Sequence, residues 1–273
     1  MRRCPAHPPW GDRRRLLNAR PPRWLEGSTV RNRTNGSLIA HGWIASAKEA
    51  ASQADIATAT LTTNLTIRRF EDTAFGILLP HLSEAELSAG QLLRVAGQRP
   101  DITYFPVDCL LSIVSTDGIE ALSVGREGSS FPELALGAAA LPLDVVVSIG
   151  GRAWSIETSK LQALAAADDS IQTCLADAYH AAFYQSALVS VGRARASRIG
   201  DLARWLYRGY EATGRASLVI THGNLASLLG TRRQTITTSL AEIEGMRLIT
   251  TRRTLILIRD HAGLGSIQNK PAY

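Results

Sequence analysis

Hydrophobic and polar positions follow three different patterns along this chain. Between residues 73 and 156, short apolar runs alternate with turn residues, which is typical of strands in an antiparallel sheet. Between residues 168 and 206, apolar residues recur every three or four positions, which indicates helices. From residue 218 to 258, two short helical patterns precede two β-rich runs. We therefore expect an α+β protein with a sheet domain, a long helix and a small mixed domain, in that order.

The first pattern predicts a small antiparallel β-roll of the jelly-roll type. Residues 75–80 and 82–87 have the composition of short helices, and strands are expected at 91–95, 102–105, 110–116, 119–124, 145–147 and 153–156. Glycines and prolines separate these runs, as they do in small barrels and rolls. Such a roll encloses either a pocket or a packed core, and the sequence does not distinguish the two.

A long helix is expected after Asp168, whose side chain can cap the helix N-terminus. A seam of small and apolar residues runs along it for about three heptads: Ile171, Leu175, Ala178, Ala182, Gln185, Val189 and Gly192. This seam favours a helix that pairs with its copy in a homodimer. The alternative is that the seam packs on the chain's own roll. A further helix is expected where four apolar residues share one face: Ile199, Leu202, Ala203 and Leu206.

The third pattern is that of a helix-turn-helix. We expect Thr221 to cap the first helix and Gly230 to end it with a positive φ. The apolar face of this helix is Leu225, Leu228 and Leu229. We expect the second helix to begin at Thr231, in a capping box with Gln234. Its buried face is Ile236, Leu240 and Ile243.

Candidate DNA-contacting residues lie on the opposite face of the second helix. Gln234 and Thr238 point away from the buried face, with Thr231, Arg232, Arg233 and Thr237 beside them near the helix N-terminus. A recognition helix usually meets base edges at that end. Residues 248–251 and 254–258 then predict a hairpin, the wing of a winged helix, with Arg252 and Arg253 at its tip. Two short helices joined by glycine also occur in proteins that never bind nucleic acid, so the basic flank and the wing are what favour DNA.

These patterns divide the chain into five segments. We expect a disordered basic N-terminal extension at 1–64, a β-roll sensory domain at 65–165 and the dimerisation helix at 166–193. The winged helix-turn-helix follows at 194–262, and a C-terminal tail at 263–273 ends the chain.

Charge is divided unevenly among these segments. Residues 1–64 carry ten Arg and Lys against four Asp and Glu, residues 65–192 seven against fifteen, and residues 193–259 twelve against four. The formal net charge of +6 therefore hides an acidic central domain between two basic segments. A basic C-terminal domain is typical of a module that binds the phosphate backbone of DNA.

Other classes of function find little support in the sequence. The three cysteines, Cys4, Cys109 and Cys174, lie far apart, and the six histidines show no metal-ligand spacing, so we expect no metal site, no cofactor and no disulfide framework. Motifs of nucleophilic or phosphate-cradling enzymes are absent, so we do not expect an enzyme. No apolar run is long enough to span a membrane, and the N-terminus lacks the apolar segment of a secretory signal. We expect a cytoplasmic protein.

Four fragments, in this order, resemble the Crp/Fnr superfamily of bacterial transcription regulators over roughly residues 70–260. They are Tyr104-Phe105-Pro106 before the strand at 111–114, Gly125-Arg126-Glu127-Gly128 after a strand, the helix at 198–206, and the helix-turn-helix at 225–237. The resemblance implies a cyclic-nucleotide-binding-like roll and a homodimer on two-fold symmetric double-stranded DNA. RNA polymerase and a small-molecule effector are further candidate partners.

By position, the resemblance assigns base contacts to Arg233, Gln234 and Thr238, and phosphate contacts to Arg252 and Arg253. Relatives that bind cyclic nucleotides carry a Gly-Glu-Leu segment and, about ten residues later, an arginine that pairs with the ligand phosphate. Here the segment contains Pro132 before Glu133, and Leu143 and Asp144 stand where the cation is needed. We therefore expect a degenerate pocket near Glu133 and an effector other than cAMP. The alternative is a ligand-binding or protein-interaction module whose winged helix no longer reads DNA.

Overall fold

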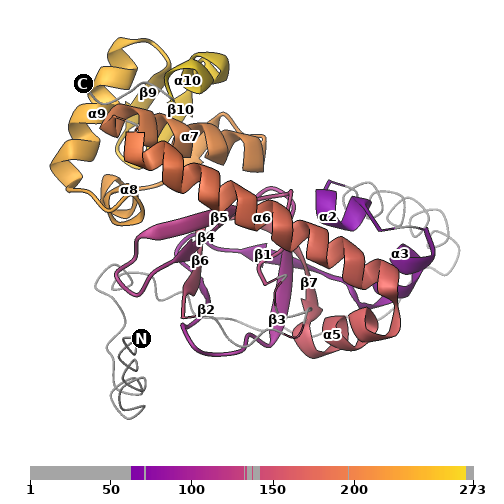
Figure 1. The fold of residues 1–273 in the computed structure, drawn as a ribbon. Coiled ribbons are helices and arrows are strands. Elements are labelled where there is room, and N and C mark those ends of the chain that lie inside the picture. Colours follow the sequence, from indigo (N-terminus) through magenta and orange to yellow (C-terminus); the bar gives the residue numbers. More distant parts are fainter. Residues whose placement is uncertain are drawn as a thin grey trace, which may run out of the picture.

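The computed structural model describes residues 63–70, 72–131, 133, 137, 142–195 and 197–268. A β-roll lies beneath one long helix, α6 (Asp169–Arg195), which crosses the molecule diagonally in Figure 1. The C-terminal domain sits at one end of α6, and the short helices α2, α3 and α5 lie at the other end (Figure 1). The α+β order expected from the sequence is confirmed.

Two antiparallel sheets form the roll. One has the order β1-β7-β3, with β1 at Ser83–Leu87, β3 at Ile102–Pro106 and β7 at Gly151–Glu157. The other has the order β2-β6-β4-β5, with β2 at Leu92–Arg94, β4 at Leu110–Val114, β5 at Glu120–Val124 and β6 at Asp144–Ile149. Side chains from both sheets pack together, among them Leu87, Leu111, Val145 and Val147, and Phe131 from the segment between β5 and β6 joins them. Each of the six strands expected from the sequence overlaps one of these strands.

The helix expected at residues 82–87 is wrong, because this segment is strand β1. It pairs with β7 from Ser83 opposite Ser155 to Leu87 opposite Gly151. Glu84 and Glu86 are exposed while Leu87 is buried, which is the two-residue alternation of a half-buried strand. Alanine, glutamate and leucine favour helices by a few tenths of a kcal/mol per residue, and pairing with β7 outweighs that preference.

Asn64 corrects the N-terminal boundary of the fold. Its side chain is fully buried and caps α2 (Leu65–Arg68), because its Oδ1 accepts hydrogen bonds from the backbone N–H of Thr66 (3.0 Å) and Ile67 (3.1 Å). Its Nδ2 donates to the carbonyls of Pro106 (2.8 Å) and Gly128 (2.9 Å) in the roll. Asn64 therefore belongs to the folded domain. The expectation of a disordered extension otherwise falls on residues 1–62, which lie outside the described residues.

Three more helical segments complete the N-terminal half. α3 (Asp72–Leu78) overlaps the helix expected at 75–80, and a single 3-10 turn, η3 (Leu79–His81), follows it. α5 (Thr158–Ala167) was not expected. The cap before α6 is confirmed, because Oδ1 of Asp168 accepts from the backbone N–H of Ser170 (2.9 Å) and Ile171 (3.3 Å).

The seam along α6 faces the chain's own roll rather than solvent. Ile171 and Leu175 are fully buried in a cluster with Phe105 and Trp154 of the roll. The seam residues from Ala182 onward are half-buried, and Gln185 and Val189 face β5 across a cavity. The first part of the seam therefore packs on the roll, as the alternative has it, and the dimer contact along α6 stays a prediction.

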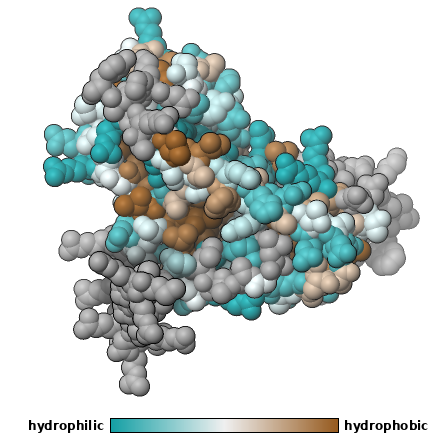
Figure 2. Space-filling model, in the orientation of Figure 1, coloured by the Kyte–Doolittle hydropathy of each residue, from teal (hydrophilic) through white to brown (hydrophobic). Residues whose placement is uncertain are grey.

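A different stripe of α6 is exposed. Tyr184, Leu188 and Val191 are 67%, 73% and 56% exposed, and Phe183 beside them is 61% exposed. Each of the first three lies one residue before a seam position, which rotates the stripe by about 100° around the helix. Figure 2 shows hydrophobic side chains gathered over the C-terminal half of α6 and the neighbouring surface of the roll.

The C-terminal domain combines four helices with a small sheet of order β8-β10-β9. Its elements are α7 (Arg198–Thr213), β8 (Ser217–Val219), α8 (His222–Leu228), α9 (Arg233–Gly245), β9 (Ile249–Arg252), β10 (Leu255–Ile258) and α10 (His261–Ile267). The helix expected around residues 199–206 is α7. Residues 263–267, assigned to a C-terminal tail, instead form part of α10 and bury Leu264 and Ile267 against the rest of the domain.

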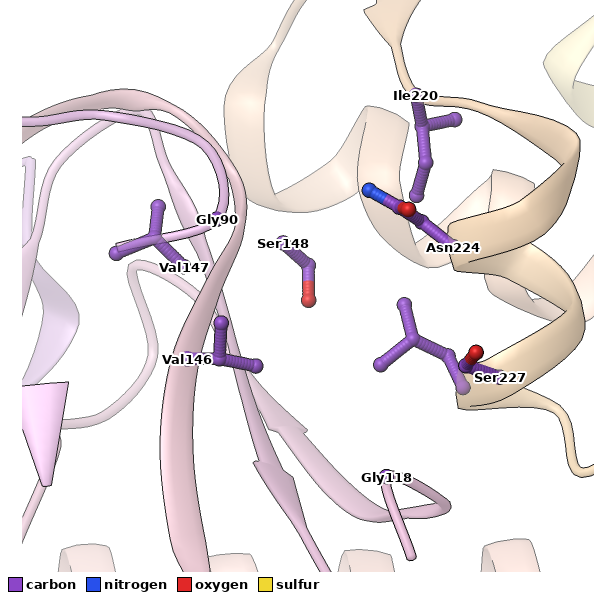
Figure 3. Close-up of a pocket in the computed structure, with 9 residues that line it drawn as sticks. Gly90, Gly118, Val146, Val147, Ser148, Ile220, Asn224 and Ser227 are labelled. Atoms are coloured by element: carbon purple, nitrogen blue, oxygen red, sulfur yellow. The ribbon is translucent and has the colours of Figure 1, made fainter. Parts of the chain in front are cut away.

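The C-terminal domain and the roll share one hydrophobic core. Leu110, Val114, Val146 and Ile149 of the roll cluster with side chains of α7, β8, α8 and α9. In Figure 3, Val146 and Ser148 of β6 face Ile220, Asn224 and Ser227 of the helix-turn-helix across a cavity of about 30 Å³. At Gly125, an added Cβ would lie 2.6 Å from Cβ of Ala212 in α7, so only glycine permits this approach.

A buried carboxyl group, that of Glu120 in β5, lies at the junction of the roll, α6 and α7. It accepts hydrogen bonds from the hydroxyl of Ser112 and from Nε1 of Trp205 in α7 (3.3 Å). From the end of α6, Arg193 donates to the backbone carbonyl of Glu120 (2.5 Å), with Nη2 3.8 Å from Oε1. Desolvation by burial raises the pKa of Glu120, against the lowering effect of these hydrogen bonds and of the arginine charges.

Two further ion pairs join the same parts. Arg208 of α7 pairs with Glu127, which follows β5, and Nη2 of Arg215 lies 3.1 Å from Oδ1 of Asp108, between β3 and β4. Three arginines of the basic C-terminal segment, Arg193 included, are thus paired with acidic groups of the roll.

Among the described residues, no helix combines the length and the hydropathy needed to cross a membrane.

The raised pKa of Glu120 predicts a pH-dependent difference between the wild-type protein and Glu120→Gln. The unfolded chain ionises near the ordinary glutamate value of about 4.5, before the folded chain does. The unfolding free energy of the wild type should therefore fall, relative to Glu120→Gln, as the pH rises above 4.5. The difference should reach about 1.4 kcal/mol for each unit by which folding raises the pKa. Urea unfolding followed by circular dichroism from pH 4 to 8 measures it, and parallel stability curves would contradict it.

Candidate nucleic-acid interface

The first helix of the helix-turn-helix, α8, begins and ends as its sequence predicts. Oγ1 of Thr221 accepts from the backbone N–H of Asn224 (3.1 Å), so Thr221 is the N-cap. Gly230 has a φ of +60°, the left-handed conformation that glycine adopts without strain. Leu225 and Leu228 are buried and Leu229 is half-buried, which fixes α8 against its own domain.

The capping box expected at Thr231 and Gln234 is wrong. The second helix, α9, begins at Arg233, its N-cap is Arg232, and no side chain caps it. The backbone N–H of Thr231 instead donates to the carbonyl of Ala226 (2.9 Å), so Thr231 still belongs to the turn. The buried face of α9 is as expected, with Ile236, Leu240 and Ile243 almost inaccessible to solvent.

Two arginines therefore stand at an uncapped helix N-terminus. The backbone N–H groups there carry a partial positive charge, which favours anions and disfavours cations. Arg232 and Arg233 are both exposed. A phosphate group bound there would satisfy free N–H groups and neutralise the arginines together.

The other predicted reading residues lie on the same exposed face of α9. Gln234, Thr237 and Thr238 are all exposed to solvent. The hydroxyl of Thr237 donates to the carbonyl of Arg233 (3.1 Å), and that of Thr238 donates to the carbonyl of Gln234 (3.2 Å). Because their protons are held by the helix, these two oxygens present acceptors to a base edge, whereas the Gln234 amide presents both a donor and an acceptor.

The wing is a two-stranded hairpin with a two-residue turn. Arg252 of β9 pairs with Leu255 of β10, which leaves Arg253 and Thr254 at the tip. Arg252 and Arg253 are both exposed, as the sequence predicts.

Sequence reasoning missed the residues that join α9 to the wing. The carboxylate of Glu244, near the end of α9, accepts from the backbone N–H (2.9 Å) and the hydroxyl (2.7 Å) of Thr251 in β9. These hydrogen bonds lower the pKa of Glu244, so the contact forms with an ionised carboxylate. Arg247, between helix and wing, is exposed and has a φ of +62°, which few residues other than glycine adopt. No pattern in the sequence distinguishes these two positions from ordinary charged surface residues.

His222 joins the two helices near the exposed face. Its Nδ1 lies 3.1 Å from Oγ1 of Thr237. Because the Thr237 hydroxyl donates to the carbonyl of Arg233, its oxygen can accept a hydrogen bond from the imidazole N–H. This contact links the start of α8 to the first turns of α9.

The site near Glu133 is occupied by an arginine from another strand. Nη1 of Arg94 in β2 lies 2.9 Å from Oε1 of Glu133, and both side chains are at least nine-tenths buried. The Arg94 guanidinium also lies over the ring of Phe131, 4.7 Å from its centroid, and its Nε donates to the carbonyl of Leu143 (3.2 Å). Sequence reasoning looked for a cation at residues 143–144 and missed Arg94, because strand pairing brings it from 39 residues before Glu133.

No group of three or more His, Cys, Asp and Glu side chains in the described part of the chain is placed to hold a metal ion. The Cys109 thiol is fully buried, and burial raises its pKa to about 12, so it is protonated at neutral pH. The Cys174 thiol donates to the carbonyl of Arg69 (3.3 Å).

The structure joins a β-roll, a long helix and a winged helix-turn-helix. Comparison with known proteins shows which proteins share this fold. Residues 202–267 match the family of Crp-like helix-turn-helix domains. No curated protein matches the chain significantly.

Solved structures show the same fold over most of the chain. FixK2 from Bradyrhizobium japonicum has a TM-score of 0.56 at 12% identity, covering 70% of this chain and 99% of FixK2. TTHB099, a CRP-family transcriptional regulator from Thermus thermophilus, has a TM-score of 0.56 at 14% identity, covering 69% and 98%. CLP, a c-di-GMP responsive global regulator from Xanthomonas campestris, has a TM-score of 0.52 at 14% identity, covering 69% and 99%. The chain thus carries a Crp-like helix-turn-helix domain within the Crp/Fnr fold.

The two threonines of the helix-turn-helix should differ in their contribution to stability. Thr221→Ala removes an N-cap hydrogen bond and should lower the unfolding free energy by about 1 kcal/mol. Thr231→Ala removes no cap and should change it by less than about 0.5 kcal/mol. Urea unfolding of both variants measures the difference. A larger loss at Thr231 would mean that the predicted capping box forms after all.

Proposed function

We propose that this chain is a transcription regulator that binds a specific, two-fold symmetric DNA site as a homodimer. The observation that carries this proposal is the unpaired basic surface of the winged helix. Arg232, Arg233, Arg252 and Arg253 are exposed and take part in no salt bridge among the described residues, unlike Arg193, Arg208 and Arg215. Free guanidinium groups on a helix-turn-helix and its wing are what a phosphate backbone requires.

Within this surface, we assign two kinds of contact. Arg233, Gln234 and Thr238 on α9 contact base edges in the major groove, and an arginine there can bond a guanine at two positions. Thr231, Arg232 and Thr237 flank them toward the backbone. Arg252 and Arg253 on the wing contact phosphates, which adds affinity without sequence preference. The Glu244–Thr251 contact holds the wing in position relative to α9.

For the homodimer, we assign the exposed stripe of α6 rather than the seam. Tyr184, Leu188 and Val191, with Phe183 beside them, expose large apolar side chains in a row along the second half of the helix. Contiguous apolar surface of this kind marks an interaction site in a folded protein. A second copy of α6 offers the same stripe, so a two-fold axis across it buries both.

We propose that the roll does not bind a cyclic nucleotide phosphate at Glu133. The Arg94 guanidinium is already paired with the Glu133 carboxylate and stacked on Phe131. A phosphate entering there would have to displace that carboxylate into a buried, apolar setting, which is costly. We therefore propose an effector other than cAMP.

Arg233→Ala tests the reading residue. Footprinting on genomic DNA fragments first locates a protected, roughly symmetric site at moderate salt. Loss of a two-position contact to guanine should then weaken that site by about 1–3 kcal/mol relative to non-specific DNA. The wing variant Arg252→Gln/Arg253→Gln should instead weaken all sequences alike and reduce the salt dependence of binding. Arg152→Ala, an exposed arginine of the roll, is the control. Unchanged affinity and specificity of Arg233→Ala would favour the interaction-module alternative.

Leu188→Glu tests the dimer contact. A charge placed in the centre of the exposed stripe cannot be buried against its copy, so the variant should be monomeric at concentrations where the wild type is dimeric. Ser190→Glu adds the same charge two residues away, on the other side of the helix, and should leave the dimer intact. Light scattering coupled to size-exclusion chromatography measures both. A dimeric Leu188→Glu variant would rule out this stripe as the interface.

A further inference from the structure

A cavity of about 230 Å³ lies between β5, the second half of α6 and α7. It is far larger than the roughly 10–15 Å³ that one water molecule needs. Its wall comes from the roll, from the long helix and from the helix-turn-helix domain, so it is distinct from the Arg94–Glu133 site inside the roll.

The charged groups of this wall are predominantly cationic. Three guanidinium groups line it, those of Arg193, Arg204 and Arg208, against the carboxyl groups of Glu120 and Asp201. These two carboxyl groups pair with Arg193 and Arg204, so the wall holds one more guanidinium than carboxyl groups. A cavity whose wall has this balance of charge favours an anion.

The arginines converge and retain unused donors. The Arg204 guanidinium lies against Gly192, the residue before Arg193, since a Cβ at Gly192 would lie 3.3 Å from Nη2 of Arg204. Arg204 uses Nη1 for Asp201 (2.7 Å) and Nη2 for the carbonyl of Gln268 (2.9 Å), out of the five N–H groups that a guanidinium carries. Nε of Arg208 is buried without a hydrogen-bond partner. A buried N–H of this kind is costly unless an acceptor meets it.

The rest of the wall is apolar or aromatic. Leu122 of β5, Val189 of α6 and Leu229 after α8 line the cavity together with Trp205 and Tyr207 of α7. A few converging polar groups in an otherwise apolar cavity are typical of a small-molecule site.

We propose that this cavity binds a small organic anion, with its charged group on Arg193 and Arg204 and an apolar or aromatic body against Val189 and Trp205. A ligand held there contacts the roll and the helix-turn-helix domain at once. This role rests on the proposed function. The ligand is then the effector, because it stabilises one arrangement of the roll and the helix-turn-helix domain over other arrangements.

The test uses benzoate and phenyl phosphate as probes, with benzamide as the neutral control. Each is titrated into the full-length protein without DNA, and the indole N–H resonance of Trp205, assigned with Trp205→Phe, reports binding. Both anions should shift it saturably with a Kd of about 1 mM or below, and benzamide should bind at least about tenfold more weakly. If benzoate binds more tightly than phenyl phosphate, the cavity prefers a carboxylate ligand, and the reverse order indicates a phosphate ligand.

Three variants locate the site. Arg204→Gln removes one guanidinium, and Gln185→Glu places a negative charge in the same wall without changing its shape; each should weaken benzoate about tenfold or more. Val189→Trp fills the cavity and should abolish binding. Arg152→Gln, on the exposed surface of the roll, should have no effect. Circular dichroism confirms that each variant is folded, and Gln185→Glu serves as the decisive variant if Arg204→Gln unfolds.

Absence of a saturable shift, or equal binding of benzoate and benzamide, would overturn this inference. So would benzoate binding that Gln185→Glu and Val189→Trp leave unchanged. Because the titration contains no DNA, it is independent of the proposed function. A protein that protects a DNA site but binds neither anion would refute the ligand site alone, and a protein that binds both anions but no DNA would refute the regulator alone.

Discussion

The buried carboxyl group of Glu120 constrains how the parts of this molecule fit together. A carboxyl group removed from water must be met by hydrogen-bond donors or cations, and here they come from Ser112 in β4, Trp205 in α7 and Arg193 at the end of α6. Separating the C-terminal domain from the roll would remove the indole donor and expose the shared core around Leu110 and Ile149. The placement of the helix-turn-helix is therefore tied to the interior of the roll.

The uneven charge of the chain has two uses rather than one. Part of the basic excess of residues 193–259 pairs with acidic groups of the roll, through Arg193, Arg208 and Arg215. Another part, at Arg232, Arg233, Arg252 and Arg253, faces solvent. A count along the sequence weighs both groups alike, so the net charge of +8 over residues 193–259 overstates what is available to a nucleic acid.

Features set by near neighbours in sequence could be predicted, and features set by distant contacts could not. The Thr221 and Asp168 caps, the left-handed Gly230 and the buried face of α9 depend on spacings of a few residues, and all are as expected. Strand β1 has helical composition but is fixed by β7, and Arg94 meets Glu133 only through strand pairing. On α6, two adjacent faces are apolar in pattern, and only the position of the roll decides which is buried. At Thr231, the turn after Gly230 runs one residue longer than a capping box allows.

The 27 residues of α6 make a rod about 40 Å long. Ile171 and Leu175 fix one end in the hydrophobic interior, whereas the other end carries Arg193, whose hydrogen bond to Glu120 depends on tenths of an ångström. A tilt of only about 1° at the fixed end moves the far end by about 0.7 Å, which is enough to break a hydrogen bond of ordinary length. A change in the tilt of α6 that is too small to disturb the packing at one end can therefore break a hydrogen bond at the other end.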